Sequence, residues 1–266
     1  MSLNEKVSII IPLYNGSSFI AKTIDSCLNQ TYRNIEVILI DDCSTDKSRE
    51  TIKPYEGQVK IIYNEVNCGI SKSVNKAMSL ASGEFFILLG HDDILPSRHV
   101  ELMLHEFEID VVSVHCNSIY IDMDDKHGLM KKSDDIQFEK TLNCAFELSI
   151  DNFINSCGMI HRTSLFNRVG GWDESYRNYG EWLFYIKSLE FGRIKYTDVS
   201  RSLYRRHGNN ITNSFSNKEV IKSLNDYKFH CRRLAYLRVV PSFFEKIKYA
   251  KSLSVEKIKY LYYLLK

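Results

Sequence analysis

Short apolar runs alternate with segments of helical spacing through the first third of this chain. Five apolar residues run without a break from Phe85 to Leu89, and three earlier runs have the same character. Such runs are typical of strands that are covered on both faces, as in a parallel sheet. The alternation predicts a βαβαβαβ order with right-handed crossovers. The predicted strands are residues 7–12, 35–40, 59–63 and 84–89, and the predicted helices are residues 17–29, 46–53 and 71–80.

Polar residues before the first two of these helices have the positions of N-caps. Ser17 or Ser18 is expected to cap the first helix, and Thr45 or Asp46 the second. A side-chain oxygen at such a position accepts a hydrogen bond from a free backbone N–H of the first turn. Pro54 predicts that the second helix ends before it.

The second half of the chain has a less regular pattern. Residues 122–135 are rich in charge and contain Gly128, which predicts a mobile loop. Residues 243–265 combine lysines with apolar and aromatic residues at near-helical spacing, which predicts a basic amphipathic helix. The other predicted strands are residues 110–115, 117–121, 158–161 and 194–204, and the other predicted helices are residues 181–190 and 216–237.

The composition is that of a globular protein that can bury a core. The chain has 266 residues, of which 44% are hydrophobic and 26% charged, and these numbers fit one large α/β domain or one domain with a tail. A net charge of +2 gives no reason to expect a nucleic-acid partner. The 7 cysteines are scattered, without zinc spacing, and no apolar run approaches the length of a membrane span. We therefore expect a cytoplasmic protein whose cysteines are small buried residues.

Pairs of carboxylates follow two of the predicted strands directly. Asp41 and Asp42 follow the second strand, and Asp92 and Asp93 follow the fourth. Turn formation and helix capping would explain such residues without any ligand. However, open α/β sheets bind ligands beyond the carboxyl ends of their strands, and two carboxylates there can hold a divalent cation that binds a diphosphate. The chain lacks the glycine-rich dinucleotide and P-loop signatures, so a nucleotide site built from carboxylates and a metal is the remaining option.

Motifs in a fixed order extend this pattern through much of the chain. Any one of them is weak, but together they are highly specific. The motifs are residues 7–15, 30–32, 36–46, 67–71 with Asn75, 81–84, 91–93, 170–174 and 181–182. Over roughly residues 6 to 207 the chain resembles the family 2 glycosyltransferases of the GT-A fold. The resemblance implies a Rossmann-like, mostly parallel α/β sheet and inverting transfer of a sugar from a nucleotide diphosphate sugar to an acceptor hydroxyl.

The resemblance also assigns roles to individual residues. Asp42 falls where the family binds the base, with uracil favoured and thymine or guanine as the alternatives. Asp92 falls on the last position of the D-x-D motif, where Mn²⁺ or Mg²⁺ is expected to bind. His207 is expected to reach the metal or the diphosphate, and Glu181 is expected to be the catalytic base. The other expected nucleotide-binding residues are Pro12, Tyr14, Asn15, Asn67 and Asp93. Arg205 and Arg206 either help to neutralise phosphate or form a solvated basic turn.

Two departures from the family pattern keep alternatives open. Gly90 stands where the first Asp of D-x-D is expected, and Gly180-Glu181 replaces the usual Glu-Asp pair. Asp173 or Glu174 is the next candidate for the base if Glu181 is not. The rival functions are a sugar nucleotidyltransferase and a GT-A-like scaffold that has lost activity.

The resemblance further suggests an organisation and partners. Residues 1–212 are expected to form the glycosyltransferase domain, with a nucleotide-binding half at about 6–96 and an acceptor half at about 97–212. Residues 213–266 are expected to form a helical extension that lies on an anionic membrane surface or on a partner. The alternative is that its apolar face docks on the catalytic domain or on a second copy of the chain. The acceptor is expected to be a saccharide, free or lipid-linked, in bacterial cell-surface polysaccharide synthesis, on the inner face of the membrane.

Overall fold

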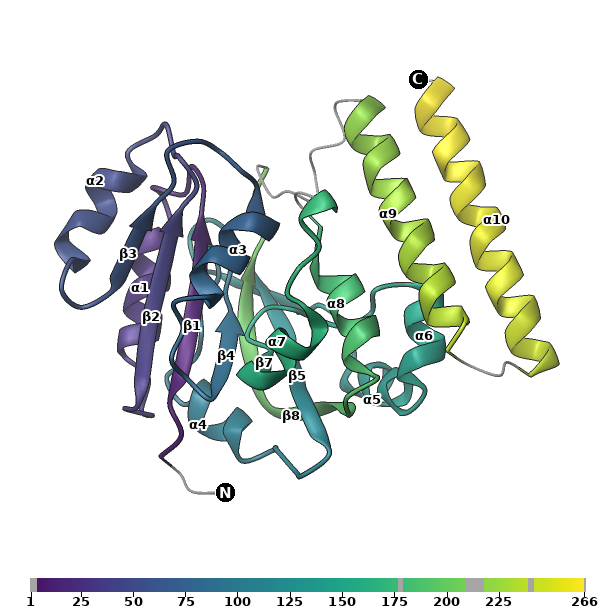
Figure 1. Ribbon diagram of the computed structural model, residues 1–266, viewed down its shortest axis with the longest axis horizontal. Coiled ribbons are helices and arrows are strands. Elements are labelled where there is room, and N and C mark those ends of the chain that lie inside the picture. Colours follow the sequence, from purple (N-terminus) through teal and green to yellow (C-terminus); the bar gives the residue numbers. More distant parts are fainter. Residues whose placement is uncertain (1–3, 177–178, 209–217, 239–241, 266) are drawn as a thin grey trace.

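A single mixed sheet lies at the centre of the protein and carries helices on both faces (Figure 1). The structure is a computed structural model, and it describes residues 4–176, 179–208, 218–238 and 242–265. In these residues the strands are β1 (Val7–Leu13), β2 (Ile35–Asp41), β3 (Lys60–Tyr63), β4 (Phe85–Leu88), β5 (Val111–Ile121), β6 (His127–Met130), β7 (Ile160–Arg162) and β8 (Arg193–Arg205).

The strand order is β3-β2-β1-β4-β7-β5-β6, and β8 also pairs with β5. Strands β1 to β4 are parallel, which confirms the parallel sheet predicted from the alternation of apolar runs and helices. β7 is antiparallel to both of its neighbours, β4 and β5, whereas β8 runs parallel to β5. The carboxyl ends of β1, β4 and β8 therefore meet the start of β7 at one edge of the sheet.

The helices form two layers that enclose the sheet. Alternate residues of β1 point to opposite layers, so that Ile9 packs with α1 and α4, while Ile10 packs with α3 and α7. The helices are α1 (Ile20–Leu28), α2 (Ser48–Ile52), α3 (Ile70–Met78), α4 (His99–Leu104), α5 (Asp134–Leu142), α6 (Cys144–Ile150), α7 (Thr163–Val169), α8 (Glu181–Ser188), α9 (Lys218–Tyr236) and α10 (Phe243–Leu265), with short 3-10 turns η1 (Lys53–Tyr55) and η2 (Glu174–Tyr176).

The capping predictions for the first two helices were mostly wrong. α1 begins after Phe19 and has no side-chain cap, because Ser17 and Ser18 lie in a turn before it. α2 begins after Lys47 and also lacks a side-chain cap. Asp46 precedes the N-cap residue of α2, Lys47. Its side chain nevertheless accepts a hydrogen bond from the backbone N–H of Ser48, the first residue of the helix, at 2.9 Å.

The second half of the chain differs more from its prediction. The two strands predicted at 110–115 and 117–121 are one long strand, β5 (Val111–Ile121). The predicted mobile loop at 122–135 contains β6, which pairs with β5, and the first residues of α5. Helices α5, α6 and α7 were not predicted. They have at most nine residues each, and the apolar residues in them do not recur at helical spacing over enough turns to be recognised in the sequence.

The C-terminal helices α9 and α10 lie side by side and pack on α6 and α8 (Figure 1). Tyr236 of α9 stacks on Tyr249 of α10 with ring centroids 4.0 Å apart, and Lys248 forms an ion pair with Glu147 of α6. The predicted boundary between residues 212 and 213 lies outside the described residues, as do the side chains of Phe243, Ile258, Leu261 and Leu265. Among the helices described, none is both long and apolar enough to cross a membrane.

Candidate active site

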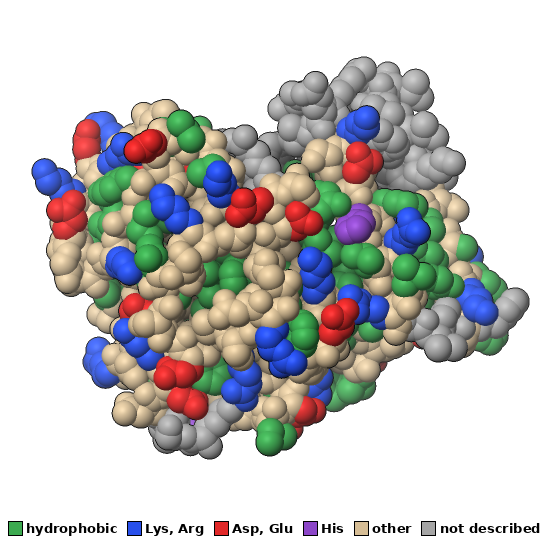
Figure 2. Space-filling model, in the orientation of Figure 1, with side chains coloured by type: hydrophobic (Ala, Val, Ile, Leu, Met, Phe, Trp, Pro, Cys, Tyr) green, Lys and Arg blue, Asp and Glu red, His purple; other side chains and the backbone are tan. Residues whose placement is uncertain are grey.

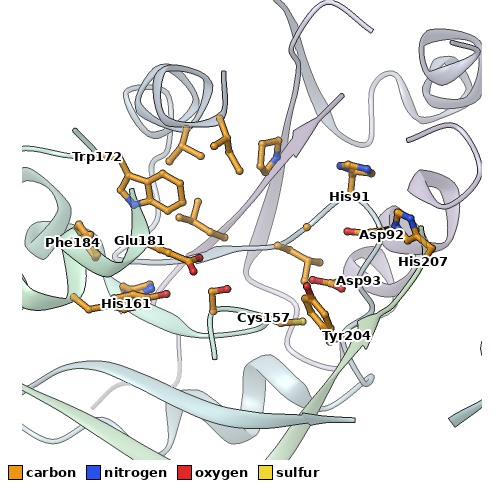
Figure 3. Close-up of a pocket in the computed structure, with 18 residues that line it drawn as sticks. His91, Asp92, Asp93, Cys157, His161, Trp172, Glu181, Phe184, Tyr204 and His207 are labelled. Carbon is orange, nitrogen blue, oxygen red and sulfur yellow. Dashed lines mark hydrogen bonds and ion pairs between the residues drawn. The ribbon is translucent and has the colours of Figure 1, made fainter. Parts of the chain in front are cut away.

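A cavity of about 220 Å³ opens at the edge of the sheet where β1 and β4 end (Figure 3). Several elements meet there because β7 is antiparallel, so its first residues lie beside the last residues of β4. α8 begins at the same edge, and the segment that follows β8 also borders the cavity. The acidic, histidine and serine side chains that line it are His91, Asp92, Asp93, Ser156, His161, Glu181 and His207.

Asp92 and His207 lie together on one side of this cavity (Figure 3). His207 Nε2 is 2.9 Å from Asp92 Oδ2, and the imidazole ring packs on Phe19 with centroids 5.0 Å apart. The residues are 115 positions apart in the chain, so this pairing depends on the sheet. The two residues expected from the resemblance to hold the metal are therefore neighbours.

Arg205 holds the segment around this pair in place. Its side chain is completely buried, donates hydrogen bonds to the carbonyl oxygens of Asp92 and Asp122, and forms an ion pair with Asp125. Its guanidinium group also lies 4.8 Å from the ring centroid of Phe19. The suggestion that Arg205 neutralises phosphate was wrong, because its charge is used inside the fold.

Asp93 is buried and hydrogen-bonded within the protein, which is not typical of an exposed metal or nucleotide ligand. Its Oδ1 accepts a hydrogen bond from the backbone N–H of Arg205 at 3.0 Å. Burial, and then the negative charge of Asp92, raises the pKa of Asp93 to about 8. A carboxyl group in this state is largely protonated at neutral pH. Its predicted contact with the nucleotide stays a prediction, although it does line the cavity.

Gly90 departs from the family pattern for a steric reason. A Cβ atom at this position would lie 2.8 Å from Asp92 Oδ1 and 2.9 Å from Asp93 Oδ2. An aspartate here would also place a third acidic group against these two. Glycine at position 90 therefore leaves room for the side chains of Asp92 and Asp93 as they lie in the structure.

Glu181 faces the cavity from the side opposite Asp92 and His207 (Figure 3). It is the first residue of α8, and its Oε1 accepts a hydrogen bond from Asn152 Nδ2 at 3.2 Å. Burial raises the pKa of Glu181, while Lys131, Ser156 and Asn152 act against this rise. A carboxylate with a raised pKa, placed in a cleft, is suited to accept a proton near neutral pH.

The alternative bases, Asp173 and Glu174, are bound elsewhere. Asp173 Oδ1 accepts hydrogen bonds from the backbone and hydroxyl of Ser175, and Glu174 Oε1 accepts one from Asn75. Neither residue lines the cavity. The geometry therefore favours Glu181 over both of them.

The second departure from the family pattern, Gly180, is explained by Trp172. A Cβ atom at position 180 would lie 2.5 Å from the indole ring. Asn75 of α3 fixes the backbone of Trp172 from the other side, since its Nδ2 donates to the Trp172 carbonyl and its Oδ1 accepts from the Trp172 N–H, both at 2.9 Å. Because glycine has no side chain, the indole of Trp172 can pack against position 180 next to Glu181, and both residues line the cavity.

Hydrogen bonds of Asn15 connect the loop after β1 to the loop after β2. Asn15 has a positive φ of 52°, and its Oδ1 accepts hydrogen bonds from the backbone N–H groups of Thr45 and Asp46. Its own N–H donates to Ser44 Oγ at 2.9 Å. Asn15 thus shapes the loops around the predicted nucleotide site, and direct contact with a nucleotide stays a prediction.

Asp42 organises the loop between β3 and α3. It is 5% exposed, and it accepts hydrogen bonds from the backbone N–H groups of Cys68 and Gly69 and from Asn64 Nδ2. Burial opposes the ionisation of Asp42, but these hydrogen bonds outweigh it and lower its pKa. Its predicted contact with the base is not tested by this geometry.

The other residues expected at the nucleotide site lie around Asp42 or the cavity mouth. Asn67 Nδ2 donates to the carbonyl of Asp42 at 3.2 Å, and Pro12 lines the cavity. Tyr14, which directly follows β1, is 46% exposed. All of the site residues predicted from the sequence therefore lie on one edge of the sheet, although they form two groups, one at Asp42 and one at the cavity.

Two residues at the site were not predicted from the sequence. Asn152 donates a hydrogen bond to Glu181, and Tyr204 lines the cavity. Neither of them stands in a recognisable local motif. His161 also lines the cavity, and burial lowers its pKa to about 3, so it is neutral and hydrogen-bonded to Ser113 Oγ at 2.7 Å.

Comparison with known proteins identifies the class to which this fold and site belong. Residues 8–167 match the model of glycosyl transferase family 2, and the chain belongs to that family. An uncharacterized glycosyltransferase of Rickettsia typhi is 29% identical over 215 residues, which are 80% of this chain and 67% of the relative. The glycosyltransferase GlyG of Streptococcus pneumoniae is 32% identical over 116 residues, which are 41% of this chain and 38% of the relative.

Solved structures show the same fold. TarS of Staphylococcus aureus, in complex with UDP-GlcNAc, superposes with a TM-score of 0.68 at 19% identity, over 93% of this chain and 71% of that one. The mannosyltransferase PcManGT of Pyrobaculum calidifontis, in complex with GDP-Man and Mn²⁺, superposes with a TM-score of 0.60 at 14% identity, over 98% and 85%. The expected GT-A fold is thereby confirmed.

Replacement of Asp42 by Asn should destabilise the protein, because an amide cannot accept from all of the donors that surround this carboxylate. We expect Asp42→Asn to lower the free energy of unfolding by about 1–3 kcal/mol, as for a buried donor left without its acceptor. Urea denaturation measures this change, and the same substitution at the exposed Asp124 should alter stability by less than about 0.5 kcal/mol. Equal stability of the two variants would mean that Asp42 does not hold the loop.

Proposed function

We propose that this protein is an inverting glycosyltransferase that moves a sugar from a UDP-sugar to an acceptor hydroxyl. The observation that carries the proposal is that Asp92, Glu181 and His207 line one cavity, although they come from three distant segments of the chain. Family membership supports sugar transfer and favours it over the nucleotidyl transfer that was the enzymatic alternative. Inversion, the UDP-sugar donor and the acceptor are parts of the proposal.

Asp92 and His207 are the residues that would hold Mn²⁺ or Mg²⁺. In the residues that the structure describes, no group of three or more His, Cys, Asp or Glu side chains is arranged to hold a metal ion. Two protein ligands nevertheless suit these cations, since Mg²⁺ is commonly bound by one or two carboxylates together with substrate phosphates and water. When bound, the cation would supply Lewis-acid stabilisation of the leaving diphosphate.

Glu181 is the proposed general base. Inversion requires the acceptor oxygen to attack the anomeric carbon from the side opposite the leaving diphosphate, and Glu181 faces Asp92 and His207 across the cavity (Figure 3). Its carboxylate removes the proton of the acceptor hydroxyl as the new bond forms. The hydrogen bond from Asn152 and the proximity of Lys131 favour the ionised form that this step needs.

The nucleotide is proposed to lie between the loops after β1, β2 and β3. Asp42 Oδ2 accepts one hydrogen bond, from Gly69, and a carboxylate oxygen can accept a second, such as that of a uracil N–H. The exposed ring of Tyr14 and the side chains of Asn15 and Asn67 would border the base and ribose. Pro12 connects this region to the cavity.

The acceptor is proposed to be a saccharide, free or linked to a lipid, used in bacterial cell-surface polysaccharide synthesis. In this proposal the C-terminal helices bring the enzyme to the inner face of an anionic membrane. On α10, Phe244 is 80% exposed, and Ile247 and Val255 are also exposed. Figure 2 shows hydrophobic side chains gathered over the lower part of the neighbouring helix α9. Lysines at 246 and 251 are exposed near them. Elsewhere on the face in view, basic and acidic side chains are interspersed (Figure 2).

Replacement of Glu181 by Gln should abolish transfer while leaving donor binding intact. We expect release of UDP from a panel of UDP-sugars with Mn²⁺ to fall by about 10²–10⁴-fold, because the amide cannot accept a proton. UDP affinity, measured by calorimetry, should not change. In the wild type, the rate should decline as the pH falls through the raised pKa of Glu181, since protonation removes the base.

Glu174→Gln is the matched control for this experiment, and it should retain transfer. If Glu174→Gln is inactive while Glu181→Gln is active, the base lies at position 174. If the wild type releases no nucleoside diphosphate from any UDP-, dTDP- or GDP-sugar, with or without Mn²⁺, the result favours the inactive scaffold that the sequence left open.

Replacement of Asp92 by Asn should weaken metal binding at the site. We expect Mn²⁺ to bind the protein–UDP complex at least tenfold more weakly, because a neutral amide replaces the charged ligand. Electron paramagnetic resonance of free Mn²⁺ measures the change, and Asp124→Asn is the control. Unaltered Mn²⁺ affinity would exclude Asp92 as a ligand.

Removal of exposed apolar side chains from α10 should weaken membrane binding. We expect the wild type to sediment with phosphatidylglycerol vesicles at low salt and to dissociate at high salt, since lysines near an anionic surface contribute about 1 kcal/mol each. The double variant Phe244→Ser, Ile247→Ser should bind less, whereas Leu129→Ser on β6 should not. Concentration-dependent dimerisation without vesicle binding would instead indicate that α10 meets a second copy of the chain.

A further inference from the structure

Lys131 directly follows β6, and its side chain reaches the segment that connects α6 to β7. The backbone N–H of Lys131 donates to the carbonyl of Ser118 in β5 at 2.8 Å. Its Nζ donates to Asn155 Oδ1 at 3.2 Å and lies 5.5 Å from the ring centroid of Tyr204. Asn155 is buried, and both Tyr204 and Ser156, the residue after Asn155, line the cavity. The ammonium group therefore lies next to residues of the cavity wall.

This ammonium group has no acidic partner in the part of the chain that the structure describes. Its contacts there are the neutral amide of Asn155 and the ring of Tyr204. Lys140, which is also half-buried, differs in this respect because its Nζ lies 3.9 Å from a carboxylate oxygen of Glu147. The positive charge of Lys131 is therefore not cancelled by an ion pair and can act on other groups around the cavity.

Glu181 is bound by the same segment that binds Lys131. Asn152 Nδ2 donates to Glu181 Oε1 at 3.2 Å, and the hydroxyl of Ser156 also hydrogen-bonds to this carboxylate. Since Asn155 precedes Ser156, the ammonium group and the carboxylate contact adjacent residues of one short segment. The two opposite charges are thereby brought near each other without forming a direct ion pair.

The other titratable groups next to Glu181 are neutral near pH 7. His161 of β7 lines the same cavity, and burial lowers its pKa to about 3. Tyr185 of α8 and Tyr227 of α9 interact electrostatically with Glu181, and burial raises the pKa of both phenols, so both remain protonated. Burial raises the pKa of Glu181, and Lys131 is the charged group that acts against this rise.

The ionisable groups across the cavity do not take this role. Asp92, Asp93 and His207 lie on the other side of the cavity from Glu181 (Figure 3). None of the three shifts the pKa of Glu181, whereas burial raises it and Lys131 lowers it. The ionisation of Glu181 therefore depends on the one cation that reaches its supporting segment.

We propose that Lys131 is a positioning residue whose charge keeps the general base Glu181 ionised during sugar transfer. A buried carboxylate without a nearby cation takes up a proton more readily, and a protonated carboxyl group cannot accept the proton of the acceptor hydroxyl. Lys131 acts through its charge on Glu181 and not by contact with the donor or the acceptor. This inference rests on the proposed function, because it requires Glu181 to be the base.

The pH profile of transfer tests this role. UDP release is measured with Mn²⁺ and the UDP-sugar that the wild type uses fastest. Without the charge, the pKa of Glu181 should rise, so Lys131→Met should move the midpoint of the profile to higher pH. Below the wild-type midpoint we expect transfer by Lys131→Met to be at least about threefold slower, and above both midpoints the rates should agree within about twofold.

Two further variants distinguish the charge from the side chain that carries it. Lys131→Arg keeps a positive charge at the same position, so it should restore the midpoint of the wild type. Lys126→Met removes an exposed lysine from the turn before β6, and it should leave the profile unchanged.

A second measurement does not depend on transfer. Carbon NMR of protein labelled at the glutamate carboxyl groups follows the titration of Glu181, whose signal is identified by its loss in Glu181→Gln. This titration should move to higher pH in Lys131→Met and should not move in Lys126→Met. If Lys131→Met does not fold, Lys131→Gln gives the same comparison, since it lacks the charge but can still donate a hydrogen bond to Asn155.

The outcomes separate this inference from the proposed function. Slower transfer by Lys131→Met at every pH, with an unchanged midpoint, would mean that Lys131 only supports the fold, and it overturns the inference. An unmoved titration of Glu181 overturns it as well, and transfer by the wild type would then still support the glycosyltransferase assignment. If the wild type transfers no sugar, the proposed function fails, and the titration still decides whether Lys131 controls the charge of Glu181.

Discussion

The buried guanidinium of Arg205 connects the parts of the site to one another. It bonds to the carbonyls of Asp92 and Asp122 and pairs with Asp125, so that one side chain joins the loop after β4, the end of β8 and the turn between β5 and β6. A buried charge is costly unless it is paired and hydrogen-bonded, and loss of one partner from such a group is strongly destabilising. The spatial relation of Asp92 to His207, two residues beyond Arg205, depends on this network.

The two glycines that depart from the family pattern are both closely packed against side chains that line the cavity. At position 90 a side chain would strike the carboxylates of Asp92 and Asp93, and at position 180 it would strike the indole of Trp172. Each glycine thus leaves room for a residue that borders the cavity.

The site combines two regions with different physical character. Around Asp42, the carboxylate accepts hydrogen bonds from the backbone N–H groups of Cys68 and Gly69 and from Asn64, and these bonds join the loops. Around Trp172 and Glu181, the cavity wall is largely apolar, and burial raises the pKa of the Glu181 carboxyl group. The first region therefore holds loops together, whereas the second places an acidic group within an apolar part of the cavity.

The local pattern of the sequence determined the nucleotide-binding half of the fold. Strands β1 to β4 and the helices between them were predicted because a strand buried on both faces is a continuous apolar run, and the carboxylates that follow β2 and β4 mark the edge where ligands bind. The resemblance then placed Glu181 and His207 in the same site. Only the tertiary structure decided how β7 inserts antiparallel between β4 and β5, what Asp42 and Arg205 bond to, and which residues face Trp172. These features arise from contacts between residues that are far apart in the chain. The burial and the hydrogen-bond partners of such residues depend on the folded arrangement, and the local spacing of apolar residues does not reveal them.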